Sequence, residues 1–217
     1  MRGGGRPGGA RWSVAAAVAA VVMGVAGCEP GDTGAVGTTA EETRTAAAPL
    51  GGACVFVKPD GARKFGHVGW GFKVTGTDRW VYGAVENPSG ALYIPPGGDI
   101  GAWHAEGSYE RMLSDMATDA HYPGESAEPY SRYRCTKSST SEVEAARAMI
   151  RTVEGRGFLV GLDPDTGEFG SRDCLDATYD VLKAYRTRRL APAYRTEIPN
   201  MWVESLVTWS DGTLTAR

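Results

Sequence analysis

Two apolar segments separated by a turn constrain the fold of this 217-residue chain more than any other feature. Residues 67–74 alternate strictly between small or polar and large apolar side chains, which is the period of a strand with one buried face. Residues 79–86 supply a second apolar strand, and Thr75–Asp78 between them is a turn signal. The pattern therefore predicts an antiparallel hairpin whose apolar face carries Val68, Trp70, Phe72 and Val74.

The length of the turn decides which residues lie opposite one another. A symmetric two- or four-residue turn pairs Trp70 with Gly83, so that a large side chain faces a small one across the hairpin. The same register pairs His67 with Glu86. A three- or five-residue loop would shift the register by one residue and bring a neighbour such as Asn87 opposite His67. We therefore expect Glu86 beside His67, with Asn87 as the alternative.

A second informative segment follows the Gly- and Asp-rich loop at residues 161–170. Ser171 or Asp173 is placed to cap a helix, so Cys174 is expected at or near its first residue. Backbone N–H groups and the helix dipole at that position favour a thiolate, although the negative charges of Asp173 and Asp176 oppose it. The apolar stripe that predicts the helix consists of Cys174, Thr178, Val181, Leu182 and Tyr185.

The remaining segments predict a mixed α+β fold in which a few antiparallel strands pack against helices. Further short strands are expected at Cys54–Val57 and at residues 158–162. Further helices are expected at residues 109–118, capped by Ser108, and from a capping box at Ser141–Glu144 to Gly155. Residues 87–101 and 122–134 are expected to be irregular, and residues 200–209 to form a short helix or strand.

The N-terminal segment has the pattern of an export signal. Three arginines precede an apolar run, Ser13–Val25, that is short for a membrane span and suited to a signal peptide. The run ends in Val25-Ala26-Gly27-Cys28, which resembles the lipobox of bacterial lipoproteins. This resemblance implies that residues 1–27 are removed and that Cys28 is diacylated, which anchors the chain to the outer face of the cell membrane. The alternative is an ordinary secretory signal with an incidental Cys28.

Residues 28–50 are rich in Gly, Thr, Ala and Glu and contain almost no large apolar side chain, so they are expected to form a flexible tether. The folded part is then residues 51–217, the size of a single domain. The whole chain has a net charge of −3, and removing residues 1–27 takes away only positive charge. The absence of a basic run argues against nucleic acid as a partner.

The sequence contains four cysteines. Lipidation of Cys28 would leave Cys54, Cys135 and Cys174, an odd number in an exported protein that can form disulfides. Three pairings are open. We favour Cys54–Cys135 with Cys174 free, and a disulfide that used Cys174 would exclude a catalytic thiol.

A thiol hydrolase needs a thiolate, an imidazole, a polar group that orients the imidazole, and N–H donors for the oxyanion. Cys174 at a helix start can supply the nucleophile, and its own and neighbouring N–H groups can supply the oxyanion donors. His67 is the preferred base because Gly69 and Gly71 on the same strand face leave room for the Cys174 helix. Glu86 is the preferred orienting residue, with Asn87 as the alternative.

The order of strand His, strand acid and helix-initiating Cys resembles the circularly permuted papain-like families, close to the NlpC/P60 and lecithin–retinol acyltransferase group. The motifs that carry the resemblance are Gly66-His67-Val68-Gly69 and Asp173-Cys174-Leu175-Asp176-Ala177-Thr178, within roughly residues 54–190. These families often have Asn before the Cys, where this chain has Asp173. The resemblance implies a papain-like fold in permuted order and a thiol-dependent amidase, peptidase or acyl transferase without a cofactor. Cell-wall peptides would be the first substrate class and lipid esters the second.

Two other interpretations stay open at this stage. The chain could be a non-catalytic envelope lipoprotein of the same fold that binds a cell-wall or lipid component. A zinc site built from His67, His104 and His121 has no ligand spacing to support it, so we expect no metal and place His104 and His121 in loops.

Overall fold

The computed structural model describes residues 51–118, 129–138 and 140–215. The expected signal peptide, the lipidation site at Cys28 and the tether at residues 28–50 lie outside these residues. Among the described residues, no helix has the length and apolar character needed to cross a membrane. The first described strand, β1, begins at Gly51.

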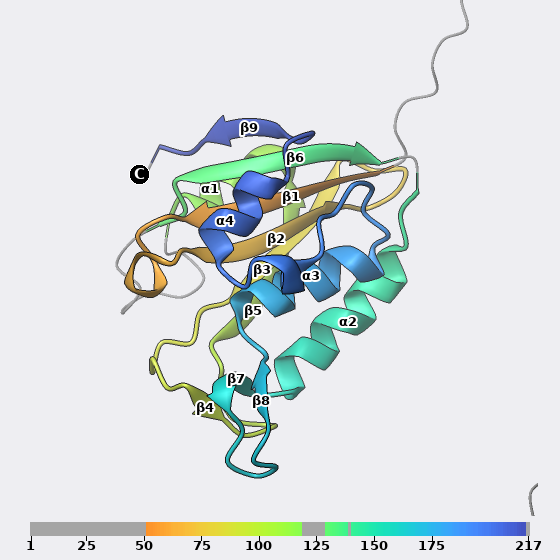
Figure 1. Cartoon of the computed structure of the whole chain (residues 1–217). Coiled ribbons are helices and arrows are strands. Elements are labelled where there is room, and N and C mark those ends of the chain that lie inside the picture. Colours follow the sequence, from red (N-terminus) through yellow and green to blue (C-terminus); the bar gives the residue numbers. More distant parts are fainter. Residues whose placement is uncertain (1–50, 119–128, 139, 216–217) are drawn as a thin grey trace, which may run out of the picture. The chain divides into compact units, whose positions relative to one another are not determined.

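A six-stranded antiparallel sheet forms the centre of the fold (Figure 1), with strand order β5-β3-β2-β1-β6-β9. All of its neighbouring pairs are antiparallel. The mixed α+β content therefore agrees with the sequence prediction. The strands are β1 (Gly51–Lys58), β2 (His67–Lys73), β3 (Arg79–Val85), β5 (Ala102–Ser108), β6 (Arg132–Ser138) and β9 (Ser210–Thr213).

The predicted hairpin register is confirmed where β2 pairs with β3. Trp70 lies opposite Gly83, and Gly69 lies opposite Ala84. Continuing this register by two residues places His67 level with Glu86, which directly follows β3. The other neighbour of β2 is β1, and there His67 lies opposite Lys58.

Helices cover both faces of the sheet (Figure 1), because alternate residues of its strands are apolar on either side. On one side, α2 (Val143–Gly155) and α3 (Cys174–Ala184) pack over Val55, Trp70 and Phe72. On the other side, α1 (Tyr109–Met116) packs over Phe56 and Tyr82.

The helix that lies close to Gly69 and Gly71 is α1 and not α3, so that part of the sequence interpretation is wrong. A Cβ atom at Gly71 would lie 2.7 Å from the sulfur of Met112, and one at Gly69 would lie 3.0 Å from the terminal carbon of Met116. The alternation of β2 places these glycines on the face that α1 covers, because the side chains of Trp70 and Phe72 point toward α3. The small residues therefore serve the packing of α1.

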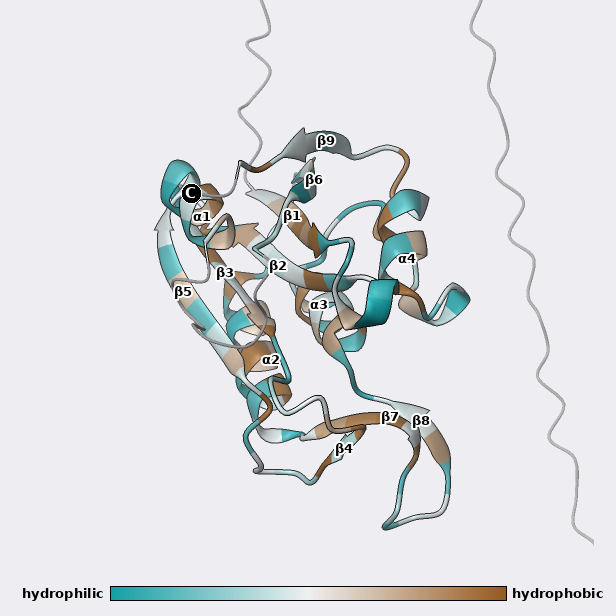
Figure 2. Ribbon diagram, turned by 90° about the vertical axis from the view of Figure 1, so that its left-hand side faces the viewer, coloured by the Kyte–Doolittle hydropathy of each residue, from teal (hydrophilic) through white to brown (hydrophobic). Residues whose placement is uncertain are grey.

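A small antiparallel sheet leads into α3. Its strands are β4 (Tyr93–Ile94), β7 (Phe158–Leu162) and β8 (Phe169–Ser171), in the order β4-β7-β8. Figure 2 shows the hydrophobic character of β7. Phe158 and Leu159 are buried, whereas Val160, Leu162 and Phe169 are exposed. Strand β8 ends three residues before Cys174, so this sheet leads directly into the start of α3.

Three segments differ from the sequence expectations. Strand β5 lies where a loop was expected around His104, and the first three residues of β6 lie in a segment expected to be irregular. The capping box expected at Ser141 does not form, because α2 begins after Glu142 and the Ser141 hydroxyl bonds to that of Thr75.

The C-terminal segment forms both a helix and a strand. Helix α4 (Pro199–Ser205) begins with proline in its first turn, and β9 then pairs with β6 at the edge of the sheet. Arg134 of β6 holds this end in place, since its guanidinium donates to the backbone oxygen of Val203 at 2.6 Å and to the Asp211 carboxylate at 2.6 Å. Two short 3-10 helices, Ala62–Lys64 and Ala193–Arg195, complete the described elements.

Candidate functional site

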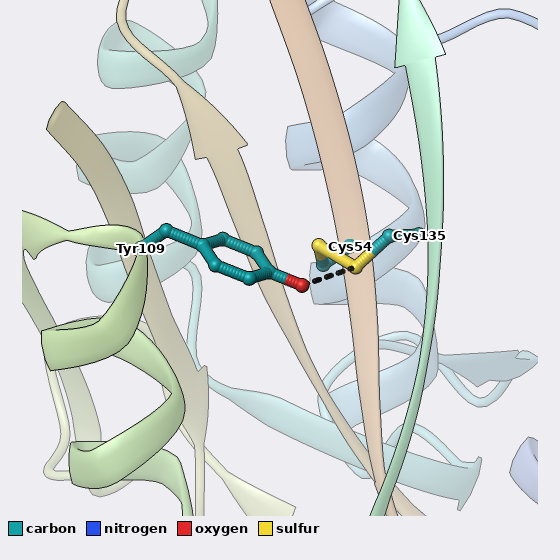
Figure 3. The surroundings of a disulfide bond; sticks show 3 residues. All are labelled: Cys54, Tyr109 and Cys135. Carbon is teal, nitrogen blue, oxygen red and sulfur yellow. Dashed lines mark hydrogen bonds between the residues drawn. A yellow bond between two sulfur atoms is a disulfide. The ribbon is translucent and has the colours of Figure 1, made fainter. Parts of the chain in front are cut away.

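The cysteines pair as the sequence favoured. Cys54 and Cys135 lie opposite each other on β1 and β6, with Cα atoms 4.1 Å apart, and form a disulfide. Figure 3 shows the Tyr109 hydroxyl beside this bond, 3.9 Å from the Cys135 sulfur. Cys174 is free and buried. A thiol is therefore available at the start of α3.

Cys174 is the first residue of α3, and a capping box fixes its position. The Asp173 carboxylate accepts hydrogen bonds from the backbone N–H of Leu175 at 2.8 Å and of Asp176 at 3.1 Å. In return, the Asp176 carboxylate accepts from the Asp173 N–H at 3.2 Å and from the Ser171 hydroxyl at 2.5 Å. The N-terminus of α3 is thus held rigidly by its own side chains.

The capping box reduces the number of backbone N–H groups that could bind an oxyanion. The N–H groups of Leu175 and Asp176 already have a carboxylate acceptor, so they are not available to a substrate oxygen. Among the hydrogen bonds of the described residues, the N–H of Cys174 itself has no acceptor. The expectation that neighbouring N–H groups serve the oxyanion is therefore wrong for these two, and Cys174 retains one backbone donor.

His67 is the first residue of β2 and brings together groups from both sides of the sheet. Its ring centroid lies 5.9 Å from that of Tyr130, which belongs to the core on the α1 side. Its imidazole also interacts with the Cys174 side chain, which belongs to the core on the α3 side. A side chain at the end of a central strand can contact the layers on both sides of the sheet. His67 therefore interacts with the Cys174 thiol as well as with Tyr130.

Glu86 lies on the other side of the imidazole. Its Oε2 is 3.0 Å from His67 Nε2, although the two atoms are not aligned as in a good hydrogen bond. Asn87, the sequence alternative, is used elsewhere: its amide donates to the Ala91 carbonyl at 3.0 Å and its side-chain oxygen accepts from the Ser89 hydroxyl. The geometry therefore selects Glu86 as the residue beside His67.

The Glu86 carboxylate is buried and receives three further donors. Lys58 Nζ lies 3.0 Å from Oε2, the Tyr130 hydroxyl donates to Oε1 at 3.0 Å, and Trp103 Nε1 donates to Oε1 at 3.2 Å. With His67, both oxygens of Glu86 are fully engaged. A buried carboxylate with this many donors is held in one orientation.

The pKa of His67 is raised and that of Glu86 is lowered, as expected for two groups that form an ion pair. Burial lowers the pKa of His67, but the Cys174 and Glu86 side chains outweigh it and raise that pKa well above 6.5. Burial raises the pKa of Glu86, but His67 and Lys58 outweigh it and lower that pKa well below 4.5. The geometry therefore favours an imidazolium beside a carboxylate at neutral pH.

Sequence reasoning missed Lys58, Trp103 and Tyr130. A partial signal for Lys58 was present, because it ends a short apolar strand directly before the turn signal at residues 59–61. That turn alone does not place Lys58 opposite His67, where the structure has it. Trp103 lies on a strand with no apolar alternation. Tyr130 belongs to the segment that was expected to be irregular, and no pattern links it to Glu86.

The Asp173 carboxylate is itself destabilised in its charged form. Burial and the adjacent Asp176 carboxylate raise the pKa of Asp173 to about 6, although the N–H groups it caps and His67 lower it. A carboxyl whose pKa is higher in the folded than in the unfolded chain loses stabilisation as the pH rises through that interval. The folded chain therefore bears the full cost of this charge at pH 7.

Replacing Asp173 with Asn is expected to stabilise the protein at pH 7 by about 1–2 kcal/mol, because Asn caps a helix as well as Asp does and carries no charge. The gain should disappear as the pH falls from 6 to 4, where Asp173 itself becomes protonated. Urea unfolding at several pH values checks this. An equal effect at pH 4 and pH 7 would contradict the assigned electrostatic cost.

The histidines do not form a metal site within the described residues, where no cluster of three or more His, Cys, Asp or Glu side chains has the geometry to hold an ion. His104 lies on β5 and not in a loop, and its Nδ1 is 2.8 Å from the Glu154 carboxylate of α2. His121 lies outside the described residues.

Comparisons with protein-family models, curated proteins and solved structures found no match for this chain. The function is therefore inferred from the residues of the site and their geometry.

Proposed function

We propose that this protein is a thiol-dependent hydrolase or acyl transferase of the permuted papain-like type. The observation that carries the proposal is the meeting of Cys174, His67 and Glu86, which come from a helix start, a strand start and a strand end. Each residue has the role that acyl transfer requires of it: nucleophile, base and orienting group. A free thiol at a capped helix start, beside a histidine paired with a carboxylate, is the arrangement expected of an activated cysteine.

In the proposed reaction, the Cys174 thiolate attacks a substrate carbonyl and forms a carbon–sulfur bond. His67, as the imidazolium, gives its proton to the leaving amine or alcohol, and a thioester remains on the enzyme. Water or another acceptor then attacks the thioester, His67 takes the acceptor's proton, and Cys174 is released. The Cys174 N–H is one donor for the oxyanion in both steps.

The setting proposed for this chemistry is the outer face of a bacterial cell membrane. The lipobox-like run at Val25–Cys28 supports a diacylated Cys28, and residues 28–50 would let the domain reach away from the bilayer. Cell-wall peptides are then the first substrate class and lipid esters the second. This assignment rests on the compartment and the family resemblance, not on a specificity pocket.

One observation favours a second candidate, a non-catalytic lipoprotein that binds an envelope component. Cys174 is 6% exposed and His67 is 8% exposed, so a substrate has little access to them. A surface hollow of about 430 Å³ lies beside Pro59 and Asn200, and neither Cys174 nor His67 contributes to its lining. A component bound there would not need the thiol.

Trapping of a covalent intermediate separates the two candidates. We expect wild-type protein quenched during reaction with a panel of acyl peptides and lipid esters to carry an acyl group on the Cys174 peptide, as detected by mass spectrometry. Cys174→Ser should abolish turnover, and His67→Ala should reduce it by about 10²-fold or more, since a general acid–base group contributes that much.

His104→Ala is the matched control, because His104 is more exposed and also contacts a carboxylate. It should retain wild-type turnover. Binding of an envelope component that survives both Cys174→Ser and His67→Ala, without any acyl adduct in the wild type, would favour the second candidate.

A further inference from the structure

Lys58 is the feature of this site that the proposed chemistry does not yet use. Its side chain is 4% exposed, which is unusual for lysine, and it lies at the end of β1 directly opposite His67. Its ammonium is 3.0 Å from Glu86 Oε2, the same oxygen that lies 3.0 Å from His67 Nε2. Lys58 also lies over the Tyr130 ring, with Nζ 4.6 Å from the ring centroid.

We propose that Lys58 is a positioning residue that shares the Glu86 carboxylate with His67, so that Glu86 orients the imidazole without an uncompensated negative charge near the thiol. This inference rests on the proposed function. Lys58 contacts Glu86 and not the reacting atoms, so its effect on Cys174 passes through Glu86 and His67.

The physical reason lies in the charges around the imidazole. Glu86 approaches His67 from the end of β3, Lys58 approaches Glu86 from β1, and Asp173 and Cys174 come from the start of α3. Without Lys58, the negative charge of Glu86 would attract the His67 proton more strongly, and the imidazolium would release that proton less readily. An imidazolium that binds its proton too tightly is a poor general acid, and added negative charge also disfavours the thiolate.

The test is the alkylation rate of Cys174 against pH in the full chain, purified in detergent, with the modified site identified by peptide mass. Lys58→Met should raise the pH at which the alkylation rate is half-maximal, its midpoint, by about one pH unit. The reason is that Cys174 and His67 then each lose a proton beside a Glu86 carboxylate whose charge Lys58 no longer balances. Lys58→Arg, which keeps the charge, should stay near the wild-type midpoint.

A double variant distinguishes an electrostatic role from a structural one. Lys58→Met combined with Glu86→Leu removes both charges and should return the midpoint toward the wild-type value, although both polar groups are lost. Only variants that keep a cooperative unfolding transition are compared. An unchanged midpoint in folded Lys58→Met, or a double variant shifted further than the single one, would overturn the inference.

The same series separates this inference from the proposed function. If His67→Ala does not alter the wild-type pH profile, the thiol–imidazole pair fails and the role of Lys58 fails with it. If His67→Ala alters the profile and Lys58→Met does not, only the role of Lys58 is overturned.

Discussion

Replacing Glu86 with Gln is expected to lower the free energy of unfolding by about 3–5 kcal/mol, the cost of removing one partner from a buried ion pair. The substitution removes the Glu86 charge that lies 3.0 Å from the buried Lys58 ammonium and turns an amide N–H₂ toward donors on Lys58 or Tyr130. Chemical denaturation at pH 7 measures the loss. Removing Lys58 as well should recover part of this loss, because the double variant no longer buries an ammonium beside a position that has lost its negative charge.

Glu106→Gln is the matched control for this prediction. Glu106 also pairs with two basic residues, Arg79 and Arg147, but its side chain is 27% exposed and the arginines are more so. Its loss should cost less than about 1 kcal/mol, as for other exposed ion pairs. A Glu86 variant that loses no more stability than the Glu106 variant would contradict a buried charge network around Glu86.

The Glu86 effect should also depend on pH. Burial raises the pKa of Glu86, but His67 and Lys58 lower it below its usual 4.5. A carboxyl with a lowered pKa in the folded chain contributes its stabilisation above the unfolded pKa and loses it as the pH falls. The difference between wild type and Glu86→Gln should therefore be full at pH 7 and narrow below about pH 4.

Replacing Cys54 and Cys135 together with Ala is expected to lower the free energy of unfolding by about 4 kcal/mol. The disulfide closes a loop of 81 residues, and a loop of that length removes substantial chain entropy from the unfolded state. It also joins β1 and β6, the pair through which the C-terminal edge strand attaches to the sheet centre.

Reduction distinguishes this bond from the packing of its sulfur atoms. Dithiothreitol should lower the stability of the wild type and leave the double variant unchanged, whereas Cys174→Ala should remain as sensitive to reduction as the wild type. A double variant as stable as the oxidised wild type, or peptide masses that place Cys174 in the disulfide, would contradict the assigned pairing.

The sequence predicted the parts of the fold that local periodicity encodes. Alternation around Trp70, together with a symmetric turn, places His67 level with Glu86, and a cap at Asp173, one of two candidates, starts a helix at Cys174. Both features depend on neighbours in the chain, so no long-range information was needed. They account for the position of Glu86 beside His67 and of Cys174 at the start of α3.

The elements that the sequence did not predict depend on pairing between residues far apart in the chain. Strand β5 is an edge strand with half-buried and exposed positions, so it lacks apolar alternation, and β6 carries the charged Arg134 that pairs across space with Glu204 and Asp211. The assignment of Gly69 and Gly71 to the wrong helix has the same origin. Periodicity shows that a face accommodates a helix, but it does not identify which helix packs there.

The most direct test of the central claim is the alkylation rate of Cys174 at pH 6 and pH 9, in wild type and in His67→Ala. An ordinary thiol, which loses its proton near pH 8.5, should react about 200-fold more slowly at pH 6 than at pH 9. We predict that the alkylation rate of wild-type Cys174 falls less than about tenfold from pH 9 to pH 6. His67→Ala should restore the pH dependence of an ordinary thiol. A wild-type rate that falls like that of an ordinary thiol, unchanged by His67→Ala, would show that His67 does not activate Cys174.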